Sequence, residues 1–421
     1  MNNDHSNTKM VIKRQNHLHV EDNSRNGDTD YSKKVEGNPV VDRGYAWLVA
    51  AGAASTFFFA GIPLIWVGSI FQAGEFIFVI PCNLLYGSLG PRKLTILGSI
   101  LIFMGFMLTS VATSVWQIFL SLSICAGLGV SFQYGVALRC VPQWFDKRRA
   151  TAFGLQSASS PLAGLILPFI VIPVYMNLSH QWIFRIFAFM SLATSAVAIA
   201  FLKDQPSRMK QEAEAKNFDF TVLKNTKLCL WLLTGPLDIS ARYIAFTFLP
   251  AYGTYIGLNN TQIAAIAAIT SSMNFFGRIL LGVLADYIGR LNMFFISMAL
   301  STLSVFTIWM FAHDFTALVG FAVTYGFFCG TWPVVNPVVT VSIVGLDKYP
   351  SATNLILLFM SLEIVLPVIA SSSGAADNIR FGDDGDLFLP HKIVGGCING
   401  TCALLCLIIK LQMNRKLFAK V

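Results

Sequence analysis

Residues 94–113 read LTILGSILIFMGFMLTSVAT, a stretch without a charged side chain. A helix needs about 20 consecutive apolar residues to cross a bilayer core about 30 Å thick. Similar runs recur from Tyr45 to Leu411. Each run must be a helix, because an open sheet edge leaves backbone groups without hydrogen bonds in lipid. The sequence therefore predicts an all-α, polytopic membrane protein.

The composition supports the same class. Of the 421 residues, 55% are apolar and only 12% are charged, and the mean hydropathy is +0.62. Soluble domains carry about a quarter charged residues, so a soluble enzyme, a secreted disulfide scaffold and a free nucleic-acid-binding protein are excluded. The sequence contains no C-x-x-C pair, HExxH motif, nucleophile elbow or P-loop. We therefore expect neither an enzyme nor a nucleotide-driven pump, and no cofactor, metal site or nucleic-acid partner.

Twelve apolar segments are predicted to span the bilayer. They are 45–61, 66–88, 94–113, 116–142, 150–176, 182–202, 228–256, 262–284, 291–312, 315–344, 351–371 and 391–411. The charged stretch 203–227 divides them six and six. This division predicts a disordered cytoplasmic tail (1–44), a six-helix half (45–202), a cytoplasmic central loop (203–227), a second half (228–411) and a cytoplasmic tail (412–421).

Basic residues near the span ends predict the orientation. The loops on the side of the N-terminal tail hold most of them, including Arg92, Lys147, Arg290 and Lys348, whereas Arg380 and Lys392 fall on the other side. Loops rich in Lys and Arg face the cytoplasm, so both termini are expected there. The plasma membrane is the expected location, and an internal membrane such as the vacuole is the alternative.

The loop between the eighth and ninth segments reads Gly282-Val-Leu-Ala-Asp286-Tyr-Ile-Gly289-Arg290. It resembles the G-x-x-x-D-R-x-G-R gating loop of the major facilitator superfamily. Its glycines allow a tight turn and a close approach of helices, and Asp286 is able to pair with cations. The equivalent stretch of the first half runs from Asn83 to Lys93 and lacks the aspartate.

Two further segments resemble signatures of the monocarboxylate transporter family, in its fungal branch. They are Asp42-Arg-Gly44-Tyr45-Ala-Trp47 and Trp144-Phe145-Asp-Lys147-Arg148-Arg149, the latter followed by ATAFG. The resemblance covers about Val41 to Leu411. It implies the major facilitator fold of twelve helices in two halves, working by alternating access. It also implies proton symport of a small organic anion such as lactate or pyruvate, or in fungal relatives a vitamin such as riboflavin.

Ionisable residues inside the spans are expected to be functional, because burying them in lipid is unfavourable. The resemblance implies that Arg278 binds the substrate carboxylate, and a guanidinium fork matches a carboxylate. Where the animal family has a proton-coupling aspartate, this chain has Asn274, which does not ionise. Asp238 and Arg242 share one helix face. Asp238 either supplies the missing carboxylate or only neutralises Arg242.

Other candidates lie deeper or line the expected path. Glu75 and Glu363 fall near the centres of their segments, where a buried carboxylate either carries a proton or stays protonated and hydrogen-bonded. Phe327, Phe328 and Trp332 lie on the tenth segment, which the resembling fold uses to line its cavity. As core packing they would look the same in the sequence.

The first segment departs from the family pattern. Residues 45–61 span only about 26 Å as a helix, at the lower limit for crossing the bilayer. The main prediction is a secondary transporter of a small organic anion. The alternative is a non-transporting sensor or regulatory protein, or a defective short isoform, that retains the fold. Neither interpretation requires an oligomer.

Overall fold

The computed structural model describes residues 71, 74–202, 219–362 and 387–413. The predicted tail 1–44, the first segment 45–61, Glu363, Arg380 and most of the central loop and C-terminal tail lie outside the described residues. Within them every regular element is a helix, and eight helical stretches are long and apolar enough to cross a membrane. The predicted all-α membrane fold is confirmed.

Two groups of helices follow one another along the chain. The first comprises α4 (Val79–Val111), α5 (Val115–Ile118), the π-helix η1 (Phe119–Ala126), α6 (Gly127–Trp144), α7 (Arg149–Asn177) and α8 (His180–Phe201). The second comprises the 3₁₀-helix η2 (Phe220–Lys224), α10 (Thr226–Tyr255), α11 (Asn260–Ile288), α12 (Arg290–Thr307), the 3₁₀-helix η3 (Trp309–Phe311), α13 (Phe315–Phe328), α14 (Trp332–Leu362) and α17 (Leu389–Met413).

Turns at glycine join helices that the sequence predicts as separate. α4 covers the second part of the predicted segment 66–88 and most of 94–113, with Gly90 at φ 73° between them. α14 joins 315–344 to 351–371 through Gly345 at φ 78°. Positive φ is accessible to glycine without steric penalty, and Pro91 then starts the next helix with its fixed φ. The predicted segment 315–344 is broken, because α13 ends at Phe328 and α14 begins at Trp332.

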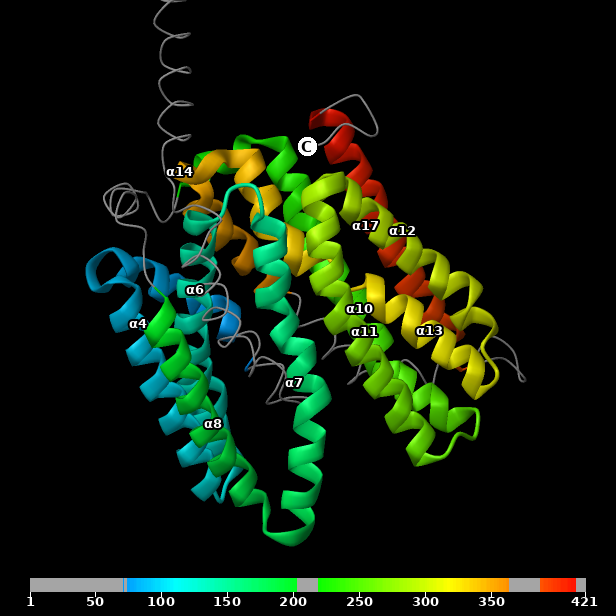
Figure 1. Cartoon of the computed structure of the whole chain (residues 1–421), viewed down its shortest axis with the longest axis horizontal. Coiled ribbons are helices and arrows are strands. Elements are labelled where there is room, and N and C mark those ends of the chain that lie inside the picture. Colours follow the sequence, from blue (N-terminus) through cyan, green and yellow to red (C-terminus); the bar gives the residue numbers. More distant parts are fainter. Residues whose placement is uncertain (1–70, 72–73, 203–218, 363–386, 414–421) are drawn as a thin grey trace, which may run out of the picture.

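Most helices pack within their own group, whereas α7 and α14 also pack on the other group. α4 packs on α6 and α8, α17 packs on α10 and α12, and α13 packs on α11. The groups meet mainly where α7 lies along α11, and α14 also contacts α4, α6 and α7 (Figure 1). α7 and α14 therefore connect the two groups.

One end of the bundle, at the top of Figure 1, carries the turns at 89–93, 145–149, 288–290 and 345–350. We call it the basic end. The basic residues of these turns are Arg92, Lys93, Lys147, Arg148, Arg149, Arg290 and Lys348. The positive charge that the sequence assigns to one side of the membrane thus gathers at one end of the folded chain.

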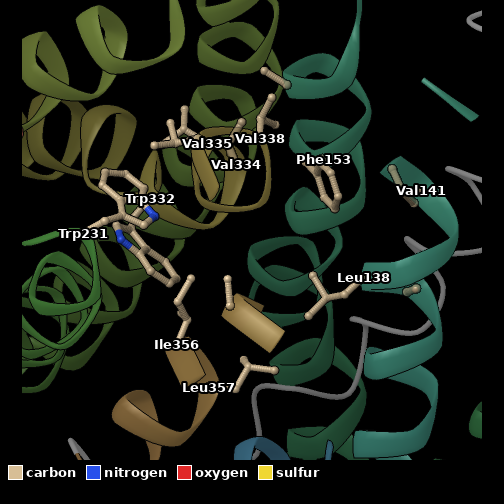
Figure 2. Packing of buried hydrophobic residues seen from close by; sticks show 14 of the residues in the cluster. Leu138, Val141, Phe153, Trp231, Trp332, Val334, Val335, Val338, Ile356 and Leu357 are labelled. Carbon is tan, nitrogen blue, oxygen red and sulfur yellow. The ribbon is translucent and has the colours of Figure 1, made fainter. Parts of the chain in front are cut away.

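An apolar cluster connects the two groups (Figure 2). Leu138 from α6 and Phe153 from α7 belong to the same cluster as Trp231 from α10 and Ile356 from α14. Two smaller clusters stay within one group each, around Phe106 and around Tyr325. Burial of apolar side chains therefore holds the groups together as well as stabilising each of them.

Gly277 allows α11 and α13 to approach closely, because a Cβ at this position would overlap the carbonyl oxygen of Phe327. A Cβ on Gly320 of α13 would instead meet no atom within 4 Å. We predict that Gly277→Ala lowers the free energy of unfolding by about 1–3 kcal/mol through overpacking. Gly320→Ala, the control, should be neutral or stabilising by about 0.5–1 kcal/mol.

The thermal unfolding midpoint in one detergent compares the two variants. Equal midpoints for Gly277→Ala and Gly320→Ala would contradict the close approach of α11 and α13.

Candidate functional site

Arg278 lies on α11 and bridges the two groups of helices. Its side chain is buried, and Nη1 donates a hydrogen bond to the carbonyl oxygen of Ser157 on α7, at 2.6 Å. Among the described residues, Nε has no hydrogen-bond partner. A buried donor left unpaired is unfavourable by about 1–3 kcal/mol. The guanidinium therefore has one donor engaged across the groups and another available to an acceptor.

The break between α13 and α14 lies against Arg278. A Cβ on Gly330 would be 2.9 Å from Nε of Arg278 and 2.8 Å from Nδ2 of Asn274. Asn274 donates to the carbonyl oxygen of Gly326 at 3.2 Å and to Sγ of Cys329 at 3.1 Å. Asn274 thus donates to a carbonyl group of the last turn of α13, to which Sγ of Cys329 also donates at 3.6 Å.

Asp238 and Arg242 form the predicted pair on α10, with Oδ2 and Nη2 3.3 Å apart. The Asp238 side chain is 1% exposed and that of Arg242 is 17% exposed. Asp238 also interacts electrostatically with Arg278. The structure therefore holds the four predicted residues as two pairs, Asp238 with Arg242 on α10 and Arg278 with Asn274 on α11, within electrostatic range of each other.

The other predicted side chains make contacts of their own. Glu75 is buried among the first-group helices and interacts electrostatically with Tyr134. Phe327 and Phe328 are half-buried, with ring centroids 5.0 Å apart. Trp332 is 3% exposed and stacks on Trp231, so in this conformation it belongs to the apolar cluster. The role of these side chains stays a prediction.

The predicted gating loop connects the groups at the basic end. Asp286 accepts hydrogen bonds from the backbone nitrogens of Ala150 (3.2 Å) and Thr151 (2.8 Å) and from Oγ1 of Thr151 (2.7 Å). The N-cap residue of α7, Arg148, makes no side-chain cap of its own. A carboxylate near the positive end of a helix dipole is stabilising. Asp286 therefore caps a helix of the other group.

The glycines of the loop set the approach of α11 to α7. A Cβ on Gly282 would lie 2.8 Å from the carbonyl oxygen of Ala150 and 3.2 Å from Cα of Gly154. Gly289 has φ 107°, and Arg290 donates to Oγ of Ser342 at 3.3 Å. We call Asp286, Gly282, Ala150, Thr151 and Gly154 the α7–α11 latch.

The sequence does not predict the partners of these residues. Ser157, Thr151 and Gly330 carry no chemical signal of their own, and only the ATAFG run that contains Thr151 stands in a family signature. Gly154 within that run does carry a signal, because a small residue permits close helix packing.

Comparison with known proteins identifies the family. The sequence model of the Major Facilitator Superfamily matches residues 41–366, and these residues include the first helix group, the second group up to α14, Arg278 and the α7–α11 latch. The chain belongs to the Major Facilitator Superfamily. It is thus an integral, multi-pass membrane transporter with a small-molecule substrate rather than an enzyme.

Fungal transporters are among the relatives of this chain. An MFS-type transporter of Gibberella moniliformis is 27% identical over 363 residues, covering 86% of this chain and 84% of the relative. The fujikurins efflux protein of Gibberella fujikuroi is 27% identical, covering 82% of this chain and 72% of the relative. The aspyridones efflux protein of Emericella nidulans is 28% identical, covering 71% and 65%.

Among solved structures, the fucose:proton symporter of E. coli matches the fold with a TM-score of 0.64 at 16% identity. The match covers 87% of this chain and 96% of the symporter. The likeness shows the major facilitator fold, as the sequence predicts.

The α7–α11 latch gives a direct prediction. Asp286→Asn removes the charge that strengthens three hydrogen bonds, so we expect hydrogen exchange at the amides of Ala150 and Thr151 to rise about tenfold, which corresponds to about 1.4 kcal/mol. Asp314→Asn is the matched control. Asp314 is exposed and accepts a hydrogen bond from the backbone nitrogen of Ala317 in its own helix group.

Exchange is measured by mass spectrometry on the full chain in lipid nanodiscs. A rise at residues 149–155 in both variants, or in neither, would contradict the role of Asp286.

Proposed function

We propose that this transporter moves a small organic anion by alternating access, with Arg278 binding its carboxylate. The observation that carries the proposal is the position of Arg278, a buried guanidinium whose Nη1 bonds α7 while Nε has no partner among the described residues. A guanidinium remains charged and offers parallel donors to the two carboxylate oxygens. An anion is therefore the class of substrate that completes this site.

The same contact links binding to the conformational change. In the structure, in which α7 packs along α11, the carbonyl oxygen of Ser157 accepts a hydrogen bond from Nη1 of Arg278. We call this arrangement of the two groups closed. A carboxylate that binds the guanidinium through two donors competes with this carbonyl, because a charge-assisted hydrogen bond is about twice as strong as a neutral one. Loss of the bond to Ser157 weakens the junction of α7 and α11. Substrate binding thereby favours separation of the two groups.

We propose that the protein lies in the plasma membrane and that its basic end faces the cytoplasm. Turns rich in Arg and Lys at this end support that orientation. Contacts between the groups gather there, which corresponds to a conformation closed to the cytoplasm.

Proton coupling is proposed to use Asp238. Asn274 does not ionise, and its amide donates a hydrogen bond to the carbonyl oxygen of Gly326 on α13. Proton binding therefore requires a carboxylate elsewhere in the protein. Asp238 is 1% exposed and interacts with both Arg242 and Arg278. A proton on Asp238 would leave Arg242 and Arg278 without a counter-charge and so favour an incoming anion.

The test of the proposed substrate class is a metabolite profile, inside and outside, of cells expressing the chain or its variants. We predict that one organic anion shifts with the parent chain and that Arg278→Ala abolishes the shift. Arg278→Lys should retain only a small fraction, because a lysine keeps the charge but not the fork. Arg185→Ala is the control, since Arg185 lies over the ring of Trp182 on α8, 5.1 Å from its centroid.

All variants must reach the membrane in equal amounts. An unchanged anion shift in Arg278→Ala would overturn the assignment of Arg278. A parent chain that shifts no solute would favour the sensor hypothesis, in which the fold is retained without transport.

A second prediction concerns coupling. Asp238→Asn keeps the shape of the side chain but binds no proton, so the dependence of anion flux on an imposed proton gradient should disappear while exchange of the anion across the membrane persists. Reconstituted vesicles with and without a pH gradient measure both quantities. Gradient-driven flux in Asp238→Asn equal to that of the parent chain would assign coupling to another group.

A further inference from the structure

The break between α13 and α14 leaves two backbone donors without an acceptor. α13 ends at Phe328 and α14 begins at Trp332. Within the described part of the chain, the backbone nitrogens of Gly330 and Trp332 donate no hydrogen bond. Both residues are buried, and a buried backbone N–H is nearly always paired in a folded protein. The two donors therefore point to an acceptor that binds at the break.

The start of α14 has the charge distribution that an anion prefers. The carbonyl oxygen of Thr331 accepts from the backbone nitrogens of Val334 and Val335, at 3.1 Å each. Its hydroxyl group donates to the carbonyl oxygen of Phe328 at 2.9 Å and so does not cap α14. Pro333 has no N–H group. The positive end of the helix dipole is thus not compensated by a Thr331 cap, and such helix starts favour anions.

Arg278 presents a charged donor to the same place. Its side chain is buried, and Nε has no hydrogen-bond partner among the described residues. A Cβ on Gly330 would lie 2.9 Å from this nitrogen, so Nε faces the break. A carboxylate has about four acceptor positions on its two oxygens. One carboxylate is therefore able to accept from the guanidinium and from the backbone at the start of α14.

Asn274 keeps the end of α13 in place beside this site. Its Nδ2 donates to the carbonyl oxygen of Gly326 at 3.2 Å and to Sγ of Cys329 at 3.1 Å. An ionised aspartate has no donor and could make neither bond. It would also place a negative charge beside a bound anion. An amide at position 274 therefore suits an anion site at the break.

Trp332 fixes the start of α14 against α10. Its Nε1 donates to Oγ1 of Thr234 at 3.2 Å, and its ring stacks on that of Trp231 (Figure 2). Donors that are already held in position bind a ligand without a further loss of conformational freedom. The backbone donors of the break are therefore ordered before an anion arrives.

We propose that a carboxylate bound at Arg278 is also held by the start of α14, through the backbone N–H groups of Gly330 and Trp332. The inference rests on the proposed function, because it completes the anion site assigned to Arg278. It adds a binding group that belongs to the backbone and so is absent from any comparison of side chains. The absence of a side chain at residue 330 then has a reason, since a Cβ would occupy the place of the ligand.

The test uses formate, the smallest carboxylate, so that it does not require the transported anion to be known. Hydrogen exchange is measured with residue resolution on the full chain in lipid nanodiscs, in formate and in chloride of equal ionic strength. We expect formate at ten times its dissociation constant to slow exchange at the amides of Gly330 and Trp332 about tenfold. The amide of Gln262 is the internal control, because Asn259 already caps that helix start.

Two alanine variants separate the site from general effects of the anion. Gly330→Ala places a methyl group 2.9 Å from Nε of Arg278, so the effect of formate at residue 332 should fall below about twofold. Gly320→Ala is the matched control, because a Cβ there meets no atom within 4 Å, and it should respond as the parent chain does. Arg278→Gln, which removes the charged donor, should lose the response as Gly330→Ala does.

Three results would overturn the proposal: no slowing at residues 330 and 332 in the parent chain, equal slowing at Gln262, or an unchanged response in Gly330→Ala. The thermal unfolding midpoint shows whether Gly330→Ala is folded. If it is not, the comparison of residues 330 and 332 with Gln262, in the parent chain and in Arg278→Gln, decides.

The outcome is independent of the metabolite profile. Transport of an anion that depends on Arg278, without slowing by formate at residues 330 and 332, would contradict the role of α14 and leave the proposed function standing. Slowing by formate in a chain that shifts no solute would support the carboxylate site and contradict transport.

Discussion

The carboxylate of Asp286 reaches from α11 to the first turn of α7 and accepts three hydrogen bonds there. The rest of the basic end depends on this contact. It supplies the cap that α7 lacks and holds Gly282 against Gly154. It also keeps α7 where the carbonyl oxygen of Ser157 receives Nη1 of Arg278. The first backbone N–H groups of a helix have no acceptor within that helix. Because Asp286 supplies the acceptor from the other helix group, the contact both caps α7 and joins the two groups.

The two contacts between the helix groups use different side chains. One side of the junction uses a charged cap and a glycine approach, and the other uses a neutral amide pair between Asn83 and Asn354. Apolar side chains fill the space between them, as Leu138, Phe153 and Ile356 show in Figure 2. Apolar burial favours closure without directionality, whereas the polar contacts fix the alignment of the helices. Because the junction combines apolar burial with directional polar contacts, the helix groups are able to separate and then to pack again in the same alignment.

The sequence predicts the fold well, because about 20 apolar residues in a row have few structural alternatives in a bilayer. It also singles out Arg278 and Asp286, since an ionisable side chain within or beside a membrane span is unfavourable unless it has a function.

The sequence does not predict the break at Gly330 that faces Arg278, nor the hydrogen bonds to Ser157 and Thr151. Those contacts depend on how helices distant in sequence approach each other. The family pattern shows only that Asn274 stands where relatives have an aspartate. It does not predict the observed hydrogen-bond partners of Asn274, Gly326 and Cys329, which lie at the end of α13. The sequence does not predict the hydrogen bond between Asn83 and Asn354 for the same reason, because the two residues are 271 positions apart along the chain.

Arg278 connects the proposed anion binding to the junction of α7 with α11. Hydrogen exchange at residues 149–157 in lipid nanodiscs, with and without the transported anion, tests this connection in the parent chain and in Arg278→Gln. We predict that the anion increases exchange in the parent chain, because the guanidinium leaves Ser157 for the carboxylate, and that it has no effect in Arg278→Gln. An anion that is bound and transported by the parent chain without any change in exchange at these residues would contradict the connection.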